Sequence, residues 1–496
     1  MPAQLSRRAV VTSTVAGAAL LGTAASKTAS AETRRPLAVS GDQALHAARR
    51  LTFGATPALV ADLRAKGLTA WLDEQLGRLP EVHGAATGPM PDVPVPNLAA
   101  QMMDAQGRGI DLKAATFARA AWGDRQVYEL LVEFWSNHLS IHAGTVGALK
   151  LADDRAVVRA HALGTFTDML LASCQSPAML RYLNNDVSRG HWPNENYARE
   201  LLELHTVGVR ARYTPAHVRD AARALTGLTI DPNTQEFRYR PEWHDVGRLR
   251  VLGWTHANTD PAKGLEVATS LVRYLASHPS TAHSIATKLV RRLVGDPVPS
   301  ALVASAAKTY LANRTAIVPT VRHIVLSRDF ARSAGRKSQR PFDWVTAAVR
   351  SLGLQQDPKM LTNATPLLQM LQRLGQAPFE WVQPDGYPDR TGAWTSTSSM
   401  LARWNTAQQL VNGGIAGLRP LDSAAVLGTP VPTTAGALAD RIVQRVLGAP
   451  TRPALKTALL LSVAMASSKA ISEATAKALT PQLAALVISS PEAMVR

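Results

Sequence analysis

The amino-acid sequence predicts a mostly α-helical protein with a single large multi-helix domain. Apolar residues recur every three or four positions through most of the chain, which is the spacing that buries one stripe of a helix. Alternating apolar and polar runs are confined to 229–256, where they predict a small β-hairpin or loop excursion. Charged residues make up 18% and hydrophobic residues 46% of the 496 residues, so the chain has a globular rather than a disordered composition.

The predicted helices follow one another along the chain, separated by turn-forming residues. Gly67 interrupts the second helix, and the Pro-rich stretch 88–97 is a predicted loop. The stretch 376–395, dense in Pro, Gly and Trp, predicts an ordered loop of the kind that often lines a site. The predicted helices span 40–51, 56–76, 125–143, 151–172, 178–183, 194–207, 215–227, 265–277, 281–294, 300–313, 317–326, 342–352, 366–374, 396–411 and most of 432–490.

The N-terminus predicts a signal peptide of residues 1–31. Two arginines within 6–8 precede an uncharged, mostly small and apolar run over 9–25, and small residues give a cleavage site after Ala31. The paired arginines favour the twin-arginine route, with an ordinary secretory signal as the alternative. Because the apolar run is too short and too polar for a membrane anchor, we expect no transmembrane anchor after cleavage. The expected location is secreted or extracytoplasmic, including association with the cell envelope.

The net charge and the cysteine count limit the classes of binding partner and of covalent cross-link expected for the mature chain. Loss of the signal peptide removes three basic residues and no acidic one, which lowers the formal net charge from +17 to +14. This charge predicts attraction to an anionic cell-wall or extracellular polymer. The basic residues are scattered and form no nucleic-acid module, so no specific nucleic-acid partner is expected. The single cysteine, Cys174, allows no intramolecular disulfide and is interpreted as a small core residue. After the signal peptide we expect a helical domain over 32–415, with C-terminal helices over 416–496 packed on it.

The most informative stretch is 191–209, which holds two histidines, three glutamates and two asparagines in 19 residues. On a regular helix Asn196, Glu200 and Glu203 share one face, whereas His205 lies nearly opposite Glu203. Carboxylates three residues apart suit an acid–base pair or a metal site, because their mutual repulsion raises one pKa. We therefore assign the catalytic role to Asn196, Glu200 and Glu203.

Other readings of this stretch and its neighbours stay open. Arg199 could pair with Glu195 and Glu203 in an ordinary salt-bridged helix. The dipeptide His244-Asp245 in the strand-like region could be a carboxylate-oriented histidine or a turn whose Asp caps the backbone. Four residues are assigned to the second shell or to substrate contact: His191, Glu195, His244 and Asp245.

A second segment supplies candidate metal ligands. His138 and His142 are four residues apart in the apolar arc of the predicted helix 125–143, where two histidines can ligate one metal ion. The alternative is a pair of buried neutral histidines bonded to the core. Together with His205 they form the candidate site for a divalent metal.

Several motifs resemble one bacterial family, catalogued as domain of unknown function 1800. They include HAARRLTFGATP at 46–57, FWSNHL at 134–139, PNENYARELLELH at 193–205 and the pair at 244–245. Shorter matches are SHP at 277–279, LGQAPF at 374–379 and RW at 403–404. The resemblance spans about 42–415. It departs at QSP (175–177), where the family usually has His-Pro, and at QPDGY (383–387), where it usually has Pro-Asn-Val-Gly-Trp.

The resemblance implies a largely helical, exported bacterial protein, often encoded beside a secreted sulfatase-like protein, and it supplies no reaction. The chain shows no nucleophile elbow, phosphate loop or dinucleotide fingerprint. We expect an enzyme with a His/Glu/Asn pocket, as a hydrolase or lyase on a cell-wall or extracellular polymer, ahead of a redox metalloenzyme. The alternative is a non-catalytic binding or assembly partner of an exported sulfatase-like protein.

Overall fold

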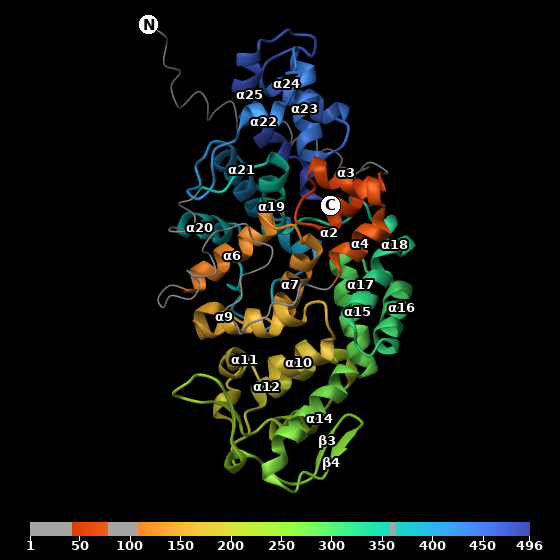
Figure 1. Cartoon of the computed structure of the whole chain (residues 1–496), viewed down its shortest axis with the longest axis vertical. Helices are drawn as coiled ribbons and strands as arrows, with labels where there is room; N and C mark the ends of the chain where they lie inside the picture. Colours follow the sequence, from red (N-terminus) through yellow and green to blue (C-terminus); the bar gives the residue numbers. More distant parts are fainter. Residues whose placement is uncertain (1–41, 78–107, 358–363) are drawn as a thin grey trace. The chain divides into compact units, whose positions relative to one another are not determined.

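The structure, a computed structural model, describes residues 42–77, 108–357 and 364–496 (Figure 1). Helices hold most of these residues, and the strands described form two small antiparallel pairs. The predicted fold class, mostly α with a small β excursion, is therefore confirmed. Within these ranges no helix is both long and apolar enough to cross a membrane. The predicted signal peptide and the Pro-rich stretch 88–97 lie outside the described residues.

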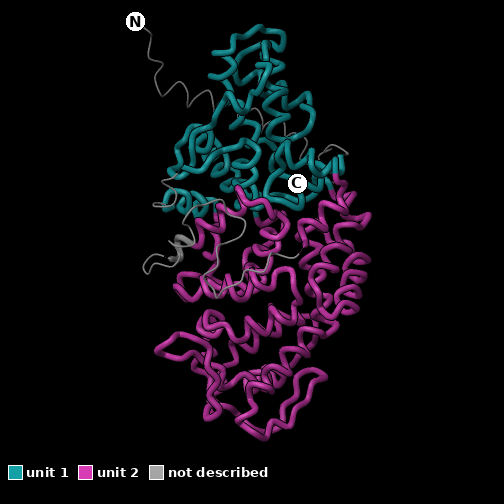
Figure 2. The backbone as a smooth tube through the Cα atoms, viewed as in Figure 1, with its two compact units in different colours: residues 1–65, 334–374, 394–496 teal, residues 66–333, 375–393 magenta. Residues whose placement is uncertain are grey.

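Contacts divide the chain into two compact units, each assembled from separate stretches of sequence (Figure 2). Unit 1 takes the described residues of 1–65, 334–374 and 394–496. Unit 2 takes those of 66–333 and 375–393. The segments that carry the predicted site, together with the loop rich in Pro, Gly and Trp up to residue 393, therefore belong to unit 2.

Unit 1 is helical, and its residues on both sides of position 415 belong to the same unit. Asp42 begins α2 by accepting hydrogen bonds from the backbone N–H groups of Ala44 and Leu45 at 2.9 and 3.2 Å. α25 packs against α21 and α23, and α23 also contacts α19. The helices are α2 (Gln43–Leu51), α3 (Pro57–Lys66, ending at the unit boundary), α19 (Pro341–Leu352), α20 (Thr365–Arg373), α21 (Thr397–Val411), α22 (Ser423–Leu427), α23 (Ala435–Leu447), α24 (Pro453–Ser462) and α25 (Glu473–Ile488).

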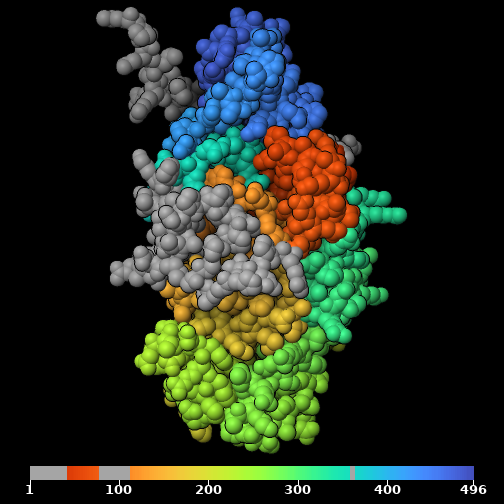
Figure 3. Space-filling model, viewed as in Figure 1, coloured from red at the N-terminus to blue at the C-terminus, as the bar shows by residue number. Residues whose placement is uncertain are grey.

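Unit 2 carries the longer series of helices. α15, α16 and α17 pack side by side and form a continuous green surface in the space-filling view (Figure 3). α12 packs on α13, and α10 packs on α14. The helices are α4 (Leu68–Gln75), α6 (Arg108–Trp122), α7 (Gln126–His138), α8 (Ala143–Val146), α9 (Leu149–Asp153), the π-helical η1 (Asp154–Arg159), α10 (Phe166–Cys174), α11 (Pro177–Tyr182), α12 (Glu195–Glu200), the π-helical η3 (Leu201–His205), α13 (Pro215–Ala224), α14 (Gly264–Ala276), α15 (Pro279–Leu293), α16 (Ser300–Ala312), α17 (Ile317–Val325) and α18 (Arg328–Ala331).

The strand-like region forms two separate hairpins in unit 2. β1 (Leu228–Ile230) pairs with β2 (Phe237–Tyr239), and β3 (Leu249–Val251) pairs with β4 (Trp254–His256). In β3 the first and last residues are buried and the middle one is exposed, so one face of the strand packs on α13.

The predicted helix 125–143 is wrong at its C-terminal end. α7 ends at His138, because Leu139 leaves the helical region with φ −101° and ψ 55°. His142 then precedes the one-turn helix α8, where the Ala143 N–H donates to the carbonyl of Phe379 at 2.9 Å. The two histidines are therefore not neighbours on one helical face, and that register argument fails.

Candidate functional site

The stretch 191–209 is the signature segment of the chain. Its helical part begins as the α-helix α12 and continues as the π-helix η3. The Asn194 side chain starts α12 by accepting from the Asn196 N–H at 2.9 Å. The wider π-helical turn of η3 follows directly, and such interruptions are frequent at functional sites. His205 is fully buried while Glu203 is half-buried, so the segment presents its carboxylate outward and its imidazole inward.

Glu200 and Glu203 lie together on the partly exposed side of this segment. The Tyr213 hydroxyl donates to Oε2 of Glu203 at 2.9 Å. Burial raises the pKa of Glu200, and the adjacent charge of Glu203 raises it further. Arg199 opposes this shift and Asp385 adds to it. A carboxyl group whose pKa is raised in this way can hold a proton for transfer.

Asp385 reaches the site from the loop 375–393, almost 200 residues along the chain. The indole Nε1 of Trp381 donates to Oδ1 of Asp385 at 2.7 Å. Burial raises the pKa of Tyr182 to about 12, with further contributions from the charges of Asp385 and Glu200. Tyr182, Asp385 and Glu200 are therefore close enough to act on one another.

Asn137 of α7 holds this loop in place. Its Oδ1 accepts from the Tyr387 N–H at 2.7 Å, and its Nδ2 donates to the Tyr387 carbonyl at 2.9 Å. Gly386, the residue before Tyr387, has φ +72°, and a Cβ there would overlap the backbone oxygen of Asn137. Tyr182 adds a hydrogen bond from its hydroxyl to the Val382 carbonyl at 2.6 Å.

Lys288 of α15 connects the site to the histidine of α7. Its Nζ donates to Nδ1 of His138 and to the carbonyl of Leu204, both at 2.9 Å. Nε2 of His138 lies 3.1 Å from the carbonyl of His205. The ring proton of His138 therefore belongs on Nε2, and Nδ1 is the acceptor.

Burial dominates the electrostatics of these two groups. Burial, helped by the charge of Arg291 and opposed by that of Asp385, lowers the pKa of Lys288 to about 8. Burial also holds the pKa of His138 well below its usual value, followed by the charge of Lys288. An amine whose pKa lies close to neutral pH thus contacts an imidazole that stays uncharged.

His205 is fully buried, and neither of its ring nitrogens has a hydrogen-bond partner among the described residues. The rings of His138 and Tyr197 lie beside it, at centroid separations of 6.3 and 6.5 Å. Burial lowers the pKa of His205 to about 3, with a further contribution from Lys288. His205 is therefore a neutral ring in an aromatic setting.

Asn196 and Glu195 lie outside the carboxylate pair. Asn196 is exposed, and its amide donates to a backbone carbonyl at 3.2 Å. Glu195 pairs with Arg199 at 2.9 Å, so the salt-bridged interpretation holds for that carboxylate. Glu203 bonds the tyrosine hydroxyl instead.

The predicted pair His244 and Asp245 is engaged within the fold. The ring nitrogens of His244 lie 2.9 Å from the Thr226 carbonyl and 2.9 Å from Oδ1 of Asn258. Asp245 forms an ion pair with Arg223 at 2.9 Å. Asp245 thereby ties the strand region to α13 through Arg223, whereas His244 contacts residues that follow α13 and β4.

The structure brings only part of the predicted metal set together. His138 and His205 are neighbours, whereas Nδ1 of His142 bonds the Thr145 hydroxyl at 2.9 Å. His191 is exposed. Within the described part of the chain, no group of three or more His, Cys, Asp or Glu side chains is placed to hold a metal ion. Metal binding by His138, His142 and His205 stays a prediction.

The stretch 175–177, where the family usually has His-Pro, faces a buried ion pair. The Ser176 hydroxyl donates to Oδ1 of Asp153 at 2.8 Å, and Lys150 pairs with the other carboxylate oxygen at 2.7 Å. Nearby in sequence, burial raises the pKa of Cys174 to about 12, which agrees with its interpretation as a core residue.

Sequence reasoning missed four side chains of the site: Tyr182, Tyr213, Lys288 and Asp385. Lys288 lies at the margin of the buried stripe of an otherwise ordinary amphipathic helix, which gives no distinctive signal. Asp385 lies in the loop that the sequence predicted to line a site, but the sequence did not show that this loop reaches Glu200. The two tyrosines become informative only through their contacts.

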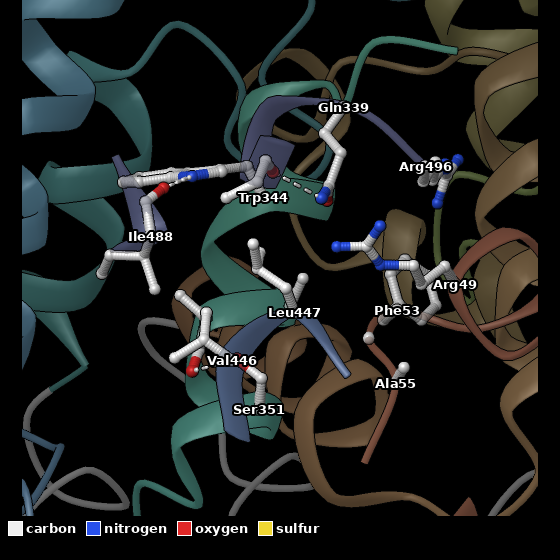
Figure 4. A pocket seen from close by; sticks show the side chains of 14 residues that line it. Arg49, Phe53, Ala55, Gln339, Trp344, Ser351, Val446, Leu447, Ile488 and Arg496 are labelled. Atoms are coloured by element: carbon white, nitrogen blue, oxygen red, sulfur yellow. Dashed lines mark hydrogen bonds between the residues drawn. The ribbon is translucent and has the colours of Figure 1, made fainter. Parts of the chain in front are cut away.

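A cavity of about 30 Å³ lies in unit 1, between α2, α19 and α23 (Figure 4). Arg49, Gln339, Ser351 and Arg496 contribute polar groups to the lining, and most of the other lining residues are apolar. Trp344 crosses one wall and donates from Nε1 to the Ile488 carbonyl at 2.8 Å. A volume of this size accommodates about one water molecule, so it is a packing feature rather than a substrate pocket.

Comparison with known proteins gives a single finding. The model of the family described as "Protein of unknown function (DUF1800)" matches residues 46–495. No curated protein and no solved structure matches the chain. The matched region includes both the signature segment and the loop that carries Asp385.

Proposed function

The chain belongs to the DUF1800 family, and because the description of that family names no activity, we propose a function from the site itself: an exported enzyme that hydrolyses a cell-wall or extracellular polymer by acid–base catalysis. Glu200 is the general acid and Glu203 the general base. The observation that carries this proposal is the unequal environment of the two carboxylates.

Two carboxyl groups with different environments can divide the acid and base roles. Burial and the neighbouring charges favour the protonated form of Glu200. The hydroxyl of Tyr213 donates to Glu203, which leaves that carboxylate oriented as an acceptor. Hydrolysis of a glycosidic bond uses this division, because one carboxyl protonates the leaving oxygen and the other activates water or attacks the sugar.

Export and charge support an extracellular polymer as the substrate. The paired arginines and apolar run of the N-terminus favour passage across the membrane. The net charge of +14 for the chain without residues 1–31 attracts anionic polymers to its surface. The proposed acid–base step needs no metal, and in this arrangement both ring nitrogens of His138 already have partners.

The test is release of new reducing ends from cell-wall polysaccharide by the mature protein. Removing a general acid or base costs about 10²- to 10⁴-fold in rate, and we expect Glu200→Gln and Glu203→Gln to fall within that range. Glu195→Gln is the matched control, because that carboxylate pairs with Arg199 on the same helix and should keep its activity. Full activity in the Glu200→Gln variant would remove the proposed acid.

One observation favours a second function, as a binding partner of an exported sulfatase-like protein. Trp192, directly before the signature helix, is 82% exposed, and large exposed aromatic side chains are enriched at protein interfaces. Binding of such a partner that is lost in Trp192→Ala but unchanged in Glu200→Gln would support this function over catalysis.

A further inference from the structure

The motif at 46–57 is not used by the proposed hydrolysis, and it forms one side of the cavity in unit 1. Residues of α19 and α23 form other sides of the same cavity. A Cβ on Gly54 would lie only 2.7 Å from Cα of Ala347, so this glycine lets the turn after α2 pack directly on α19. Four residues of the motif line the cavity: Arg49, Phe53, Gly54 and Ala55.

The lining of the cavity is positively charged. Arg49 and Arg496 are cationic, and none of the described lining residues is acidic. The guanidinium of Arg496 pairs with Asp343 at 3.2 Å, and the main-chain oxygen of Arg496 accepts from Arg50. Arg49 forms no hydrogen bond or ion pair with any residue that the structure describes. Arg49 is therefore the lining cation whose charge is not matched by a direct contact.

The charge of Arg49 persists at neutral pH. Burial lowers the pKa of Arg49 to about 10, and the charge of Glu492 opposes the shift. The carboxylate of Glu492 is itself paired with Arg452 at 3.5 Å. A guanidinium with this pKa stays protonated, and a charge without a close partner is costly to bury. An anion in the cavity offsets this cost by direct contact.

Gln339 supplies a second hydrogen-bond donor to the cavity. Its Nε2 carries two N–H groups, and one of them donates to the Ala493 carbonyl at 2.8 Å. The guanidinium of Arg49 extends from α2 toward the side of the cavity that carries Gln339 (Figure 4). The volume of about 30 Å³ admits one water molecule or one monatomic anion of similar size, and it excludes an organic anion.

We propose that this cavity binds one chloride ion, held by the guanidinium of Arg49 and the side-chain amide of Gln339. Hydrogen bonds between a guanidinium and an anion are shorter and stronger than those between neutral groups. The ion connects α2 with the residue pair that precedes α19, and both belong to unit 1. Its role is therefore structural, and it is separate from the proposed acid–base step.

The test is ³⁵Cl NMR of the full-length protein at constant ionic strength, with gluconate as the replacing anion because it is too large for the cavity. Bound chloride broadens the ³⁵Cl line, and added bromide should remove this excess width by competing for a single site. Arg49→Met should weaken chloride binding by about 10- to 100-fold, because it removes a hydrogen bond to a charged group. Arg373→Met is the matched control, since Arg373 of α20 is exposed and does not line the cavity.

A second measurement decides the case even where Arg49→Met does not fold. Crystals of the wild-type protein grown in bromide should show an anomalous difference peak between Arg49 and Gln339. Glu200→Gln should bind chloride as the wild type does even where hydrolysis is lost, so the two proposals fail separately. An excess linewidth that survives in folded Arg49→Met assigns the chloride to surface cations, and a cavity without a bromide peak holds water; either result overturns the proposal.

Discussion

Replacing Gly386 by alanine should undock the loop that brings Asp385 to the site. Gly386 has φ +72°, and a Cβ there would overlap the Asn137 carbonyl and lie 2.9 Å from Oδ1 of the same residue. The loop must then move away from α7, which breaks the paired hydrogen bonds between Asn137 and Tyr387.

The size of the effect follows from these contacts. A non-glycine residue in the left-handed region costs about 1–2 kcal/mol. Each of the two lost hydrogen bonds contributes about 1 kcal/mol net. The docked loop should therefore be destabilised by about 3 kcal/mol, which is more than a hundredfold in its docking equilibrium.

Amide hydrogen exchange of Tyr387 reports on this equilibrium, because its N–H donates to Asn137 at 2.7 Å. We expect its protection to fall by about a hundredfold in Gly386→Ala. Gly392 is a matched control in the same loop, since its backbone lies outside the left-handed range and no atom lies within 4 Å of an added Cβ. Unchanged Tyr387 protection in Gly386→Ala would refute the docking argument.

Two further predictions concern titration. Burial and the charge of Glu203 raise the pKa of Glu200, so Glu203→Gln should lower that pKa. Glu195→Gln should not lower it, because Glu195 pairs with Arg199. A carboxyl ¹³C NMR titration of Glu200 in each variant measures the difference. Burial lowers the pKa of His205 to about 3 from an ordinary 6.5, so the unfolded chain binds the extra proton between these values and stability falls as the pH drops below 6.5. Between pH 7.5 and 5 the loss should be about 2 kcal/mol in urea unfolding. His205→Gln should remove this part of the slope, and the exposed His191→Gln should leave it; equal slopes for all three proteins would contradict the assignment.

The fold class was predictable because apolar periodicity reports directly on helix burial. Helix ends were less predictable, because they depend on contacts with distant segments. The predicted helix 125–143 shows the difference: periodicity continues past His138, but the Ala143 N–H pairs with Phe379 across the chain. The division into two units was not predictable from the sequence either. The loop 375–393 belongs to unit 2, although the residues on both sides of it belong to unit 1.

The sequence predicted that Glu200 and Glu203 are neighbours, and they remain so although the α-helix gives way to a π-helical turn between them. It could not place Asp385 or Lys288, whose contacts with the signature come from residues far apart in the chain. The separation of His205 from the carboxylates was predicted from ideal helical angles. The structure reaches the same separation by a different geometry, because a π-helical turn begins at Leu201.

The π-helical turn η3 places three neighbouring residues in three different settings: Glu203 at the half-buried surface, the Leu204 carbonyl against Lys288, and His205 in the core. In a π-helix each backbone N–H bonds the carbonyl five residues earlier, so the hydrogen-bond ladder is locally shifted relative to an α-helix. The Leu204 carbonyl is bonded to Lys288, and the His205 carbonyl faces His138. The main chain of this segment therefore orients both the Lys288 amine and the His138 imidazole, through backbone atoms rather than side chains.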